Sequence, residues 1–259
     1  MSAIEVTTQA QLDKALAKLK DGDWIVCLGG IWNNPLVVYG SAPVEASGSA
    51  TVEASGSATV RAYGSATVRA SGSATVWASG SATVRASGSA TVRASGSATV
   101  RAYGSATVRA SQCVAVHRMP CGAPKITGGV ILDVPDPATL DARDWCDYYG
   151  VEVSRGYASL FKAVDDDWST PRARAAGIFY TVGAKIVAPD WKPTAACGNG
   201  LHASPRPMLA RGYNDAATRY VQVKAKVADI VVIDNKVKVP ALTVVCECDL
   251  NGDPVGVAA

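Results

Sequence analysis

A glycine falls at every eighth position from Gly40 to Gly104, and each one opens nearly the same phrase, Gly-Ser-Ala-Thr-Val-x-Ala-Ser/Tyr. The members of this series are Gly40, Gly48, Gly56, Gly64, Gly72, Gly80, Gly88, Gly96 and Gly104. An octapeptide has room for only one short strand and one corner, so the copies bury apolar surface only by stacking on one another. The period therefore restricts this part of the chain to a repetitive, stacked architecture.

Alternation within each octad predicts a β-strand. In the copy Ala58-Thr59-Val60-Arg61-Ala62, the alanines and the valine point to one face, and the threonine and arginine point to the other. Gly56 and its serine neighbours supply the corner, because glycine tolerates positive φ and serine hydroxyls bond to nearby backbone. The recurring glycines and β-branched pairs disfavour a helix, and the regular apolar stripe disfavours disorder. We expect a parallel β-solenoid with either two or three octads per coil, and the small alanines favour two.

The residues before the octads predict a cap for the solenoid, which otherwise exposes an apolar end and a strand edge. Thr7 and Thr8 offer a helix N-cap, and Asp21-Gly22-Asp23 predicts the end of that helix. Its apolar positions follow helical spacing: Leu12, Ala15, Leu16 and Leu19. A strand, Trp24–Leu28, and Gly29-Gly30 come next. This order resembles the N-terminal caps of right-handed parallel β-helix proteins such as the pectate-lyase-like folds.

The composition changes near residue 118 and divides the chain into two parts. The repeat decays through a degenerate tenth copy, Ser111–Arg118, in which Val116 keeps the valine position. Later strands are predicted at 160–164, 178–182, 185–187, 220–227, 230–233 and 242–248, and helices at 137–149 and 207–213. We expect a cap with first strands at 1–38, the solenoid at 39–118, a connector with a helix at 119–150 and an α+β domain at 151–259. The fold class is therefore mainly β, a helix-capped parallel β-solenoid followed by an α+β domain.

The net charge of the chain is only +3, but the charges are unevenly distributed. Seven arginines and no lysine lie between Gly40 and Arg118, against the two acids Glu45 and Glu53. The variable outward position of the octads reads Glu45, Glu53, Arg61, Arg69, Trp77, Arg85, Arg93, Arg101, Arg109 and His117. With two octads per coil, Arg69, Arg85 and Arg101 share one column, and Arg93 and Arg109 lie in the other. Like charges in register repel by ~0.2–1 kcal/mol per pair, which favours an anionic partner.

The outward positions predict a basic surface dotted with aromatic side chains that binds a macromolecular partner, either nucleic acid or an acidic host protein. The candidate contact residues are Arg61, Arg69, Arg85, Arg93, Arg101, Arg109, Trp77, Tyr63 and Tyr103. Arginine without lysine supports binding, because guanidinium groups suit phosphate and stacking contacts. The alternative is a solubilising surface whose charges protect strand edges. An ice-binding or glycan-binding threonine plane is disfavoured by the arginine beside each threonine.

Seven cysteines and the absence of an export signal predict reduced thiols in the cytoplasm. No run of about 18 apolar residues is present, so we expect no membrane span. Cys113, His117 and Cys121 form one possible metal-binding spacing, and Cys197 and His202 with the pair Cys246/Cys248 form a second. Neither is a recognised zinc knuckle, so we expect buried or free cysteines and no metal site.

Common catalytic motifs such as the phosphate-binding loop and the nucleophile elbow are absent. The segment from Cys197 to Pro205, followed by Ala210-Arg-Gly-Tyr213, resembles the nicotinamide pocket of ADP-ribosyltransferase-like folds. That resemblance implies NAD as cofactor, His202 at the aromatic position, Tyr213 in the pocket and Glu247 as the catalytic acid. The family has a His or Arg on the first strand of the domain, where this chain offers only Lys162. Without the transferase activity no cofactor is expected.

The octads and the later segments around Trp145-Cys-Asp-Tyr-Tyr and Val-Cys-Glu-Cys-Asp-Leu-Asn-Gly are similar to uncharacterised proteins of actinobacteriophages and their actinobacterial hosts. The resemblance runs from Gly40 onward and implies a host-interaction role in the cytoplasm of a bacterial host cell. We therefore expect a protein that binds its partner through the solenoid surface. The alternatives are an ADP-ribosyltransferase-like enzyme using the pocket at 198–213 and a structural spacer.

Overall fold

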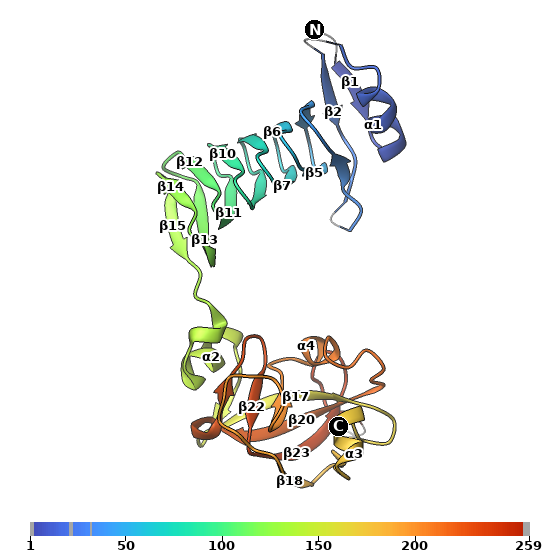
Figure 1. Ribbon diagram of the computed structural model, residues 1–259, viewed down its shortest axis with the longest axis vertical. Coiled ribbons are helices and arrows are strands. Elements are labelled where there is room, and N and C mark those ends of the chain that lie inside the picture. Colours follow the sequence, from blue (N-terminus) through green and yellow to red (C-terminus); the bar gives the residue numbers. More distant parts are fainter. Residues whose placement is uncertain (1–2, 21–22, 32, 256–259) are drawn as a thin grey trace. The chain divides into compact units, whose positions relative to one another are not determined.

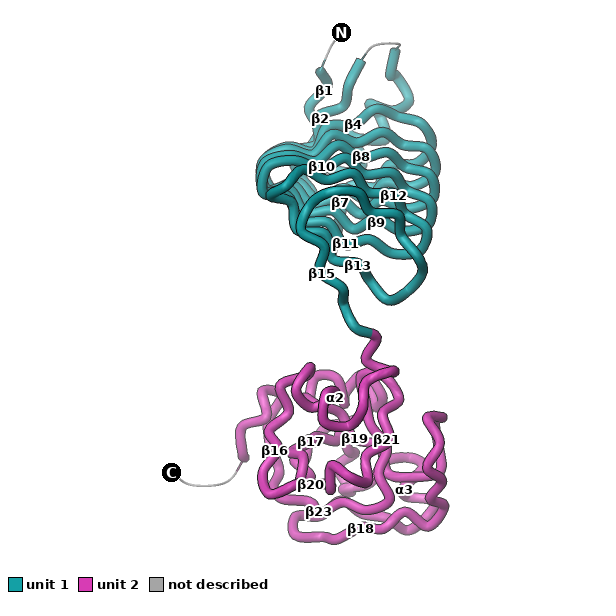
Figure 2. Tube along the Cα trace, turned by 90° about the vertical axis from the view of Figure 1, so that its left-hand side faces the viewer, with its two compact units in different colours: residues 1–135 teal, residues 136–259 magenta. Residues whose placement is uncertain are grey.

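The computed structural model describes residues 3–20, 23–31 and 33–255. Two compact units make up the chain, residues 1–135 and residues 136–259 (Figure 2). Within the described part of the chain, no helix has both the length and the apolar character needed to cross a bilayer.

The first unit is a parallel β-solenoid in which successive octads lie alternately in two sheets (Figure 1). The first sheet contains, in spatial order, β1 (Ala3–Val6), β2 (Trp24–Cys27), β4 (Pro43–Ala46), β6 (Thr59–Ala62), β8 (Thr75–Ala78), β10 (Thr91–Ala94), β12 (Thr107–Ala110) and β14 (Lys125–Thr127). The second contains β15 (Val130–Asp133), β13 (Ala115–Gly122), β11 (Thr99–Gly104), β9 (Thr83–Ala86), β7 (Thr67–Ala70), β5 (Thr51–Ala54) and β3 (Leu36–Val38). The prediction of a stacked β-coil is confirmed, with two octads per coil.

The inward alanines and valines form the core of the solenoid. Parallel register places Val60 directly beside Val76 and Ala62 beside Ala78, and these side chains are almost completely buried. Small residues at two of the three inward positions allow the two sheets to pack closely, because little side-chain volume separates them. The alternation that predicted the strands thus also supplies the core.

The corners explain why glycine recurs. Gly72 has φ +62°, and a Cβ atom built on it would lie 3.1 Å from the backbone nitrogen and oxygen of Gly56 in the coil before it. The Ser73 amide and hydroxyl both donate to the carbonyl oxygen of Gly56, at 2.9 and 3.0 Å. A side chain at this position therefore meets both backbone strain and the neighbouring coil.

The N-terminal cap is helix α1 (Gln9–Leu16), and the N-cap predicted at Thr8 is confirmed. Thr8 and Gln11 form a capping box, and the side chain of Gln9 bonds to both backbone groups of Val37, at 2.7 and 3.0 Å. Leu12 is buried against the solenoid core. The helix ends at Leu16, with Ala17 as its C-cap, so it stops earlier than the end predicted at Asp21-Gly22-Asp23, of which residues 21–22 lie outside the described residues. Strand β1, which precedes the helix, was not predicted, because only four residues form it.

The solenoid continues beyond residue 118, where the recognisable octads end. Val116 is buried in its expected position, but β14 then pairs with β12, and β15 pairs with β13. The segment expected to be a connector therefore begins with two more strands of the solenoid. Neither carries the octad phrase, so the periodicity gave no signal for them.

The second unit combines antiparallel sheets with short helices. Its elements are η1 (Pro137–Thr139), α2 (Ala142–Tyr149), β16 (Val153–Ser154), β17 (Tyr157–Val164), α3 (Pro171–Ala175), β18 (Lys185–Val187), β19 (Leu201–Ala203), α4 (Pro207–Arg211), β20 (Arg219–Lys226), η2 (Val227–Asp229), β21 (Val231–Val232), β22 (Val237–Val239) and β23 (Ala241–Cys248). One sheet has the order β16-β17-β20-β23-β18, and the other has the order β19-β22-β21. Phe161 and Ser204 join the two through a pair of 2.8 Å backbone hydrogen bonds.

The strand predicted at 178–182 is wrong. This segment has no strand partner among the described residues; Tyr180 is buried, with 2% exposed, whereas Phe179 and Val182 are exposed. The Tyr180 amide donates to the carbonyl oxygen of Trp168, which holds the segment as a loop over the core. A run of β-branched and aromatic residues therefore occurs here without a β-ladder.

Candidate functional site

The outward position of the octads forms one column on each sheet. On the first sheet the column reads Glu45, Arg61, Trp77, Arg93, Arg109 and Thr127. On the second it reads Glu53, Arg69, Arg85, Arg101 and His117. These are the two groupings of arginines expected for two octads per coil. In-register pairing therefore places the arginines of each column beside one another on strands ~4.8 Å apart.

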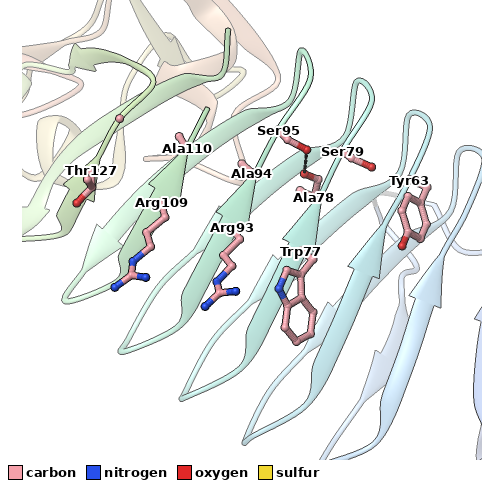
Figure 3. A pocket seen from close by; sticks show the side chains of 11 residues that line it. Tyr63, Trp77, Ala78, Ser79, Arg93, Ala94, Ser95, Arg109, Ala110 and Thr127 are labelled. Carbon is pink, nitrogen blue, oxygen red and sulfur yellow. Dashed lines mark hydrogen bonds between the residues drawn. The ribbon is translucent and has the colours of Figure 1, made fainter. Parts of the chain in front are cut away.

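A groove of about 470 Å³ follows the column of the first sheet (Figure 3). Trp77, Arg93 and Arg109 project from successive strands along one side of it, and Tyr63 closes one end. Small residues form its floor: Ala78, Ser79, Ala94, Ser95, Ala110 and Gly128. The groove exists because the octad places one long side chain between short ones.

The charges along this column differ between its two ends. The guanidinium of Arg61 stacks on the ring of Trp24 at 4.1 Å, and the Ser47 hydroxyl donates to Glu45 at 2.9 Å. Among the described residues, no carboxylate lies within ion-pair distance of Arg93 or Arg109. The part of the column next to the groove therefore offers two guanidinium groups to an anion.

The second sheet carries a smaller groove of about 330 Å³, lined by Arg69, Arg85 and Tyr103 together with Glu53. A carboxylate oxygen of Glu53 lies 3.7 Å from Nη1 of Arg69. Arg101 stands in the same column but does not line the groove. Because an acid occupies one end of this groove, the groove of the first sheet is the better site for an anion.

In the second unit, His202 and Tyr213 line one cavity of about 350 Å³. His202 lies on β19, and its backbone oxygen accepts a 2.9 Å hydrogen bond from Nζ of Lys162 on β17. Burial and the neighbouring lysines lower the pKa of His202 to about 4, so its imidazole is neutral at pH 7. The Tyr213 hydroxyl donates to Oδ1 of Asn235. Two of the three residues implied by the transferase resemblance thus lie together.

Glu247, the third of those residues, does not line this cavity. It lies on β23, and its Oε1 accepts a 2.8 Å hydrogen bond from Nη1 of Arg219 on the adjacent strand β20. The guanidinium of Arg219 in turn stacks on the ring of Trp168 at 4.7 Å. Glu247 is therefore engaged in an ion pair of the sheet rather than directed at His202 and Tyr213.

Residues 158–253 match the family model for a Domain of unknown function (DUF7666). The match includes both sheets' main strands in the second unit, the cavity with His202 and Tyr213, and Glu247. It does not include the solenoid. The chain matches no curated protein and no solved structure.

The cysteines, several of them within the DUF7666 match, are all free thiols. Among the described residues, no group of three or more His, Cys, Asp or Glu side chains could hold a metal ion. Neither cysteine–histidine spacing therefore forms such a group. Cys113, Cys121 and Cys197 are exposed, whereas burial raises the pKa of the Cys248 thiol to about 12.

Several cations in the DUF7666 match were missed or undervalued by sequence reasoning. Lys236 and Arg172 line the cavity with Lys162, and Lys238 lies beneath the loop before His202, fully buried. Nζ of Lys238 donates to the carbonyl oxygens of Ala196 and Gly198, at 3.0 and 3.2 Å. The only sequence signal was the alternation of lysines with valines at 236–239, which is more typical of an exposed strand face.

Proposed function

We propose that the protein binds single-stranded nucleic acid along the groove of the first solenoid sheet. The observation that carries this proposal is the combination of Arg93 and Arg109, which lack acidic partners in the described part of the chain, with the aromatic rings of Trp77 and Tyr63 around one groove. Proteins that hold single strands combine a cationic groove with aromatic platforms in this way.

Each residue type has a distinct part in this binding. Arg93 and Arg109 contact successive phosphates, because planar guanidinium groups donate two parallel hydrogen bonds to phosphate oxygens. Trp77 is 37% exposed and Tyr63 is 41% exposed, so part of each ring is accessible to a ligand. Stacking of one base on an aromatic side chain contributes about 1–3 kcal/mol and tolerates any base.

The setting that we infer for the protein is compatible with this proposal. The resemblance to actinobacteriophage proteins supports a role in the cytoplasm of a bacterial host cell, where nucleic acid is an abundant polyanion. An acidic host protein is the alternative partner, and a passive spacer is the alternative role. Both are outcomes of the experiment below.

Binding is measured by fluorescence anisotropy with a labelled oligothymidylate and the full-length protein, at low and moderate salt. The double variant Arg93→Ser/Arg109→Ser is compared with Arg85→Ser/Arg101→Ser, which removes the same charge from the second sheet. We expect salt-dependent binding that falls more than tenfold in the first variant and clearly less in the second. Equal losses in both variants contradict a specific groove.

A competition arm separates the two kinds of partner. Poly-glutamate lacks bases, so we expect it to displace the oligonucleotide poorly. If poly-glutamate competes as well as unlabelled oligothymidylate, the groove is a general acidic-polymer site and an acidic protein is the better partner. Absence of binding to either polymer leaves the spacer role.

A further inference from the structure

We propose that the cavity between β17, β19 and α4 in the second unit binds a small molecule that carries a phosphate group. Three cationic side chains line this cavity, Lys162, Arg172 and Lys236. Its other polar lining groups are Thr170, His202, Ser204, Tyr213 and Asn214, which supply hydrogen-bond partners for oxygen atoms. No carboxylate is among the lining residues of the described chain.

Two nearby acids, Asp165 and Asp190, are engaged outside the cavity. Asp165 accepts from Arg174 at 2.8 Å and from the side-chain amide of Asn214 at 2.9 Å. Asp190 accepts from Arg172 at 3.1 Å, in an exposed pair. The charges of Lys162 and Lys236 consequently have no neutralising group inside the cavity, and a bound anion supplies it.

Lys162 and Lys236 influence each other across this space. Nζ of Lys162 lies 4.7 Å from the centre of the Tyr180 ring and bonds to the carbonyl oxygen of His202, while Nζ of Lys236 lies 3.8 Å from the centre of the Tyr213 ring. Burial, followed by repulsion from Lys236, lowers the pKa of Lys162 to about 8. A phosphate oxygen near both ammonium groups relieves this repulsion.

The cavity also has an apolar part. Phe161, Ala163 and Ala210 line it beside the ring of Tyr213. Its volume of about 350 Å³ is that of a site for a small organic ligand rather than for an ion alone. We therefore infer a phosphate ester whose organic portion packs against these residues. This inference is independent of the solenoid groove, because all of these residues belong to the second unit.

The test uses the full chain with inorganic phosphate, adenosine 5′-monophosphate and, as a neutral control, adenosine. Binding is measured by calorimetry for the unaltered protein, Lys236→Gln and the matched control Lys224→Gln, whose lysine is exposed on β20. We expect both phosphate probes to bind, at least tenfold loss of affinity in Lys236→Gln, and no change in Lys224→Gln. Failure of both phosphate probes at millimolar concentration, or equal affinity in the two variants, overturns the proposal.

A second measurement does not depend on altering the cavity. The chain has only two histidines, so the ring proton of His202 is assigned by NMR with a His117→Asn variant. We expect phosphate to shift the His202 signal and to raise its pKa from about 4, because an anion favours the imidazolium form. A His202 signal that phosphate leaves unmoved overturns the proposal, even if phosphate binds elsewhere on the chain.

Discussion

Arg93 and Arg109 lie directly beside each other on the parallel strands β10 and β12, and no carboxylate of the described residues pairs with either. Such a pair costs free energy in the isolated protein, because like charges in register repel. The same arrangement gives an anion two adjacent guanidinium groups. The two arginines therefore lower the stability of the free protein but favour the binding of an anion.

Replacing Arg109 by glutamate reverses one of the two charges. We expect Arg109→Glu to raise the free energy of unfolding by roughly 0.5 kcal/mol through attraction to Arg93, while oligothymidylate binding is lost. Urea denaturation and anisotropy measure the two effects. Arg109→Gln is the control and should give a smaller gain in stability. A variant that is less stable and still binds contradicts the account.

The corner glycines differ in what lies beneath them. A Cβ atom on Gly72 meets Gly56 at 3.1 Å, whereas no described residue lies within 4 Å of one on Gly48, although both glycines have φ above +60°. Gly48→Ala should therefore lower the free energy of unfolding only by the cost of an alanine at positive φ, about 1–2 kcal/mol. Gly72→Ala should lower it by more, because its Cβ atom also meets the neighbouring coil. Urea denaturation of the two variants gives the difference. Equal losses show that coil stacking does not require glycine.

Lys238 anchors the loop that precedes β19. Its ammonium group donates to the carbonyl oxygens of Ala196 and Gly198 and to Oγ1 of Thr194, so Lys238→Met removes all three hydrogen bonds but keeps most of the side-chain volume. We expect a loss of about 2–3 kcal/mol in stability. Hydrogen exchange of residues 194–200 should become faster, with the solenoid peptides unchanged. Unaltered exchange in this loop contradicts an anchoring role.

His202 makes the second unit sensitive to acid. Its pKa is lowered from 6.5 to about 4 by burial first and neighbouring cations second, so the unfolded chain binds a proton more readily than the folded chain. The free energy of unfolding is therefore unaffected by the titration of His202 above pH 6.5, and it falls as the pH is lowered from 6.5 to about 4. His202→Gln should flatten that part of the stability–pH curve. An unchanged slope in this variant contradicts the assignment.

The solenoid was predictable because each octad repeats the same local information. The inward stripe, the corner and the strand register all follow from one phrase, so two octads per coil already placed Arg93 beside Arg109. The strands β14 and β15 lack that phrase and were missed. The expected strand at 178–182 is wrong for the opposite reason, because its β-branched and aromatic residues resemble a strand although only Tyr180 is buried.

The cavity of the second unit was only partly predictable. The glycine-rich segment before His202 drew attention to the correct place, and Tyr213 lies there as expected. The cations that give the cavity its charge come from β17, α3 and the turn before β22, which are far apart in the sequence. Sequence spacing does not show that these residues lie together. The transferase resemblance also implied a role for Glu247, which pairs with Arg219 instead.

Trp77 lies between Arg61 and Arg93 in the column of the first sheet, at an octad position that most other copies fill with a charged residue. Trp77→Arg therefore tests the proposed stacking most directly. The variant adds a positive charge and restores the common octad, so the fold is kept. If bases stack on Trp77, anisotropy will show weaker binding of oligothymidylate at moderate salt despite the added charge. Tighter binding by Trp77→Arg would contradict the account, because it would show that charge alone holds the ligand.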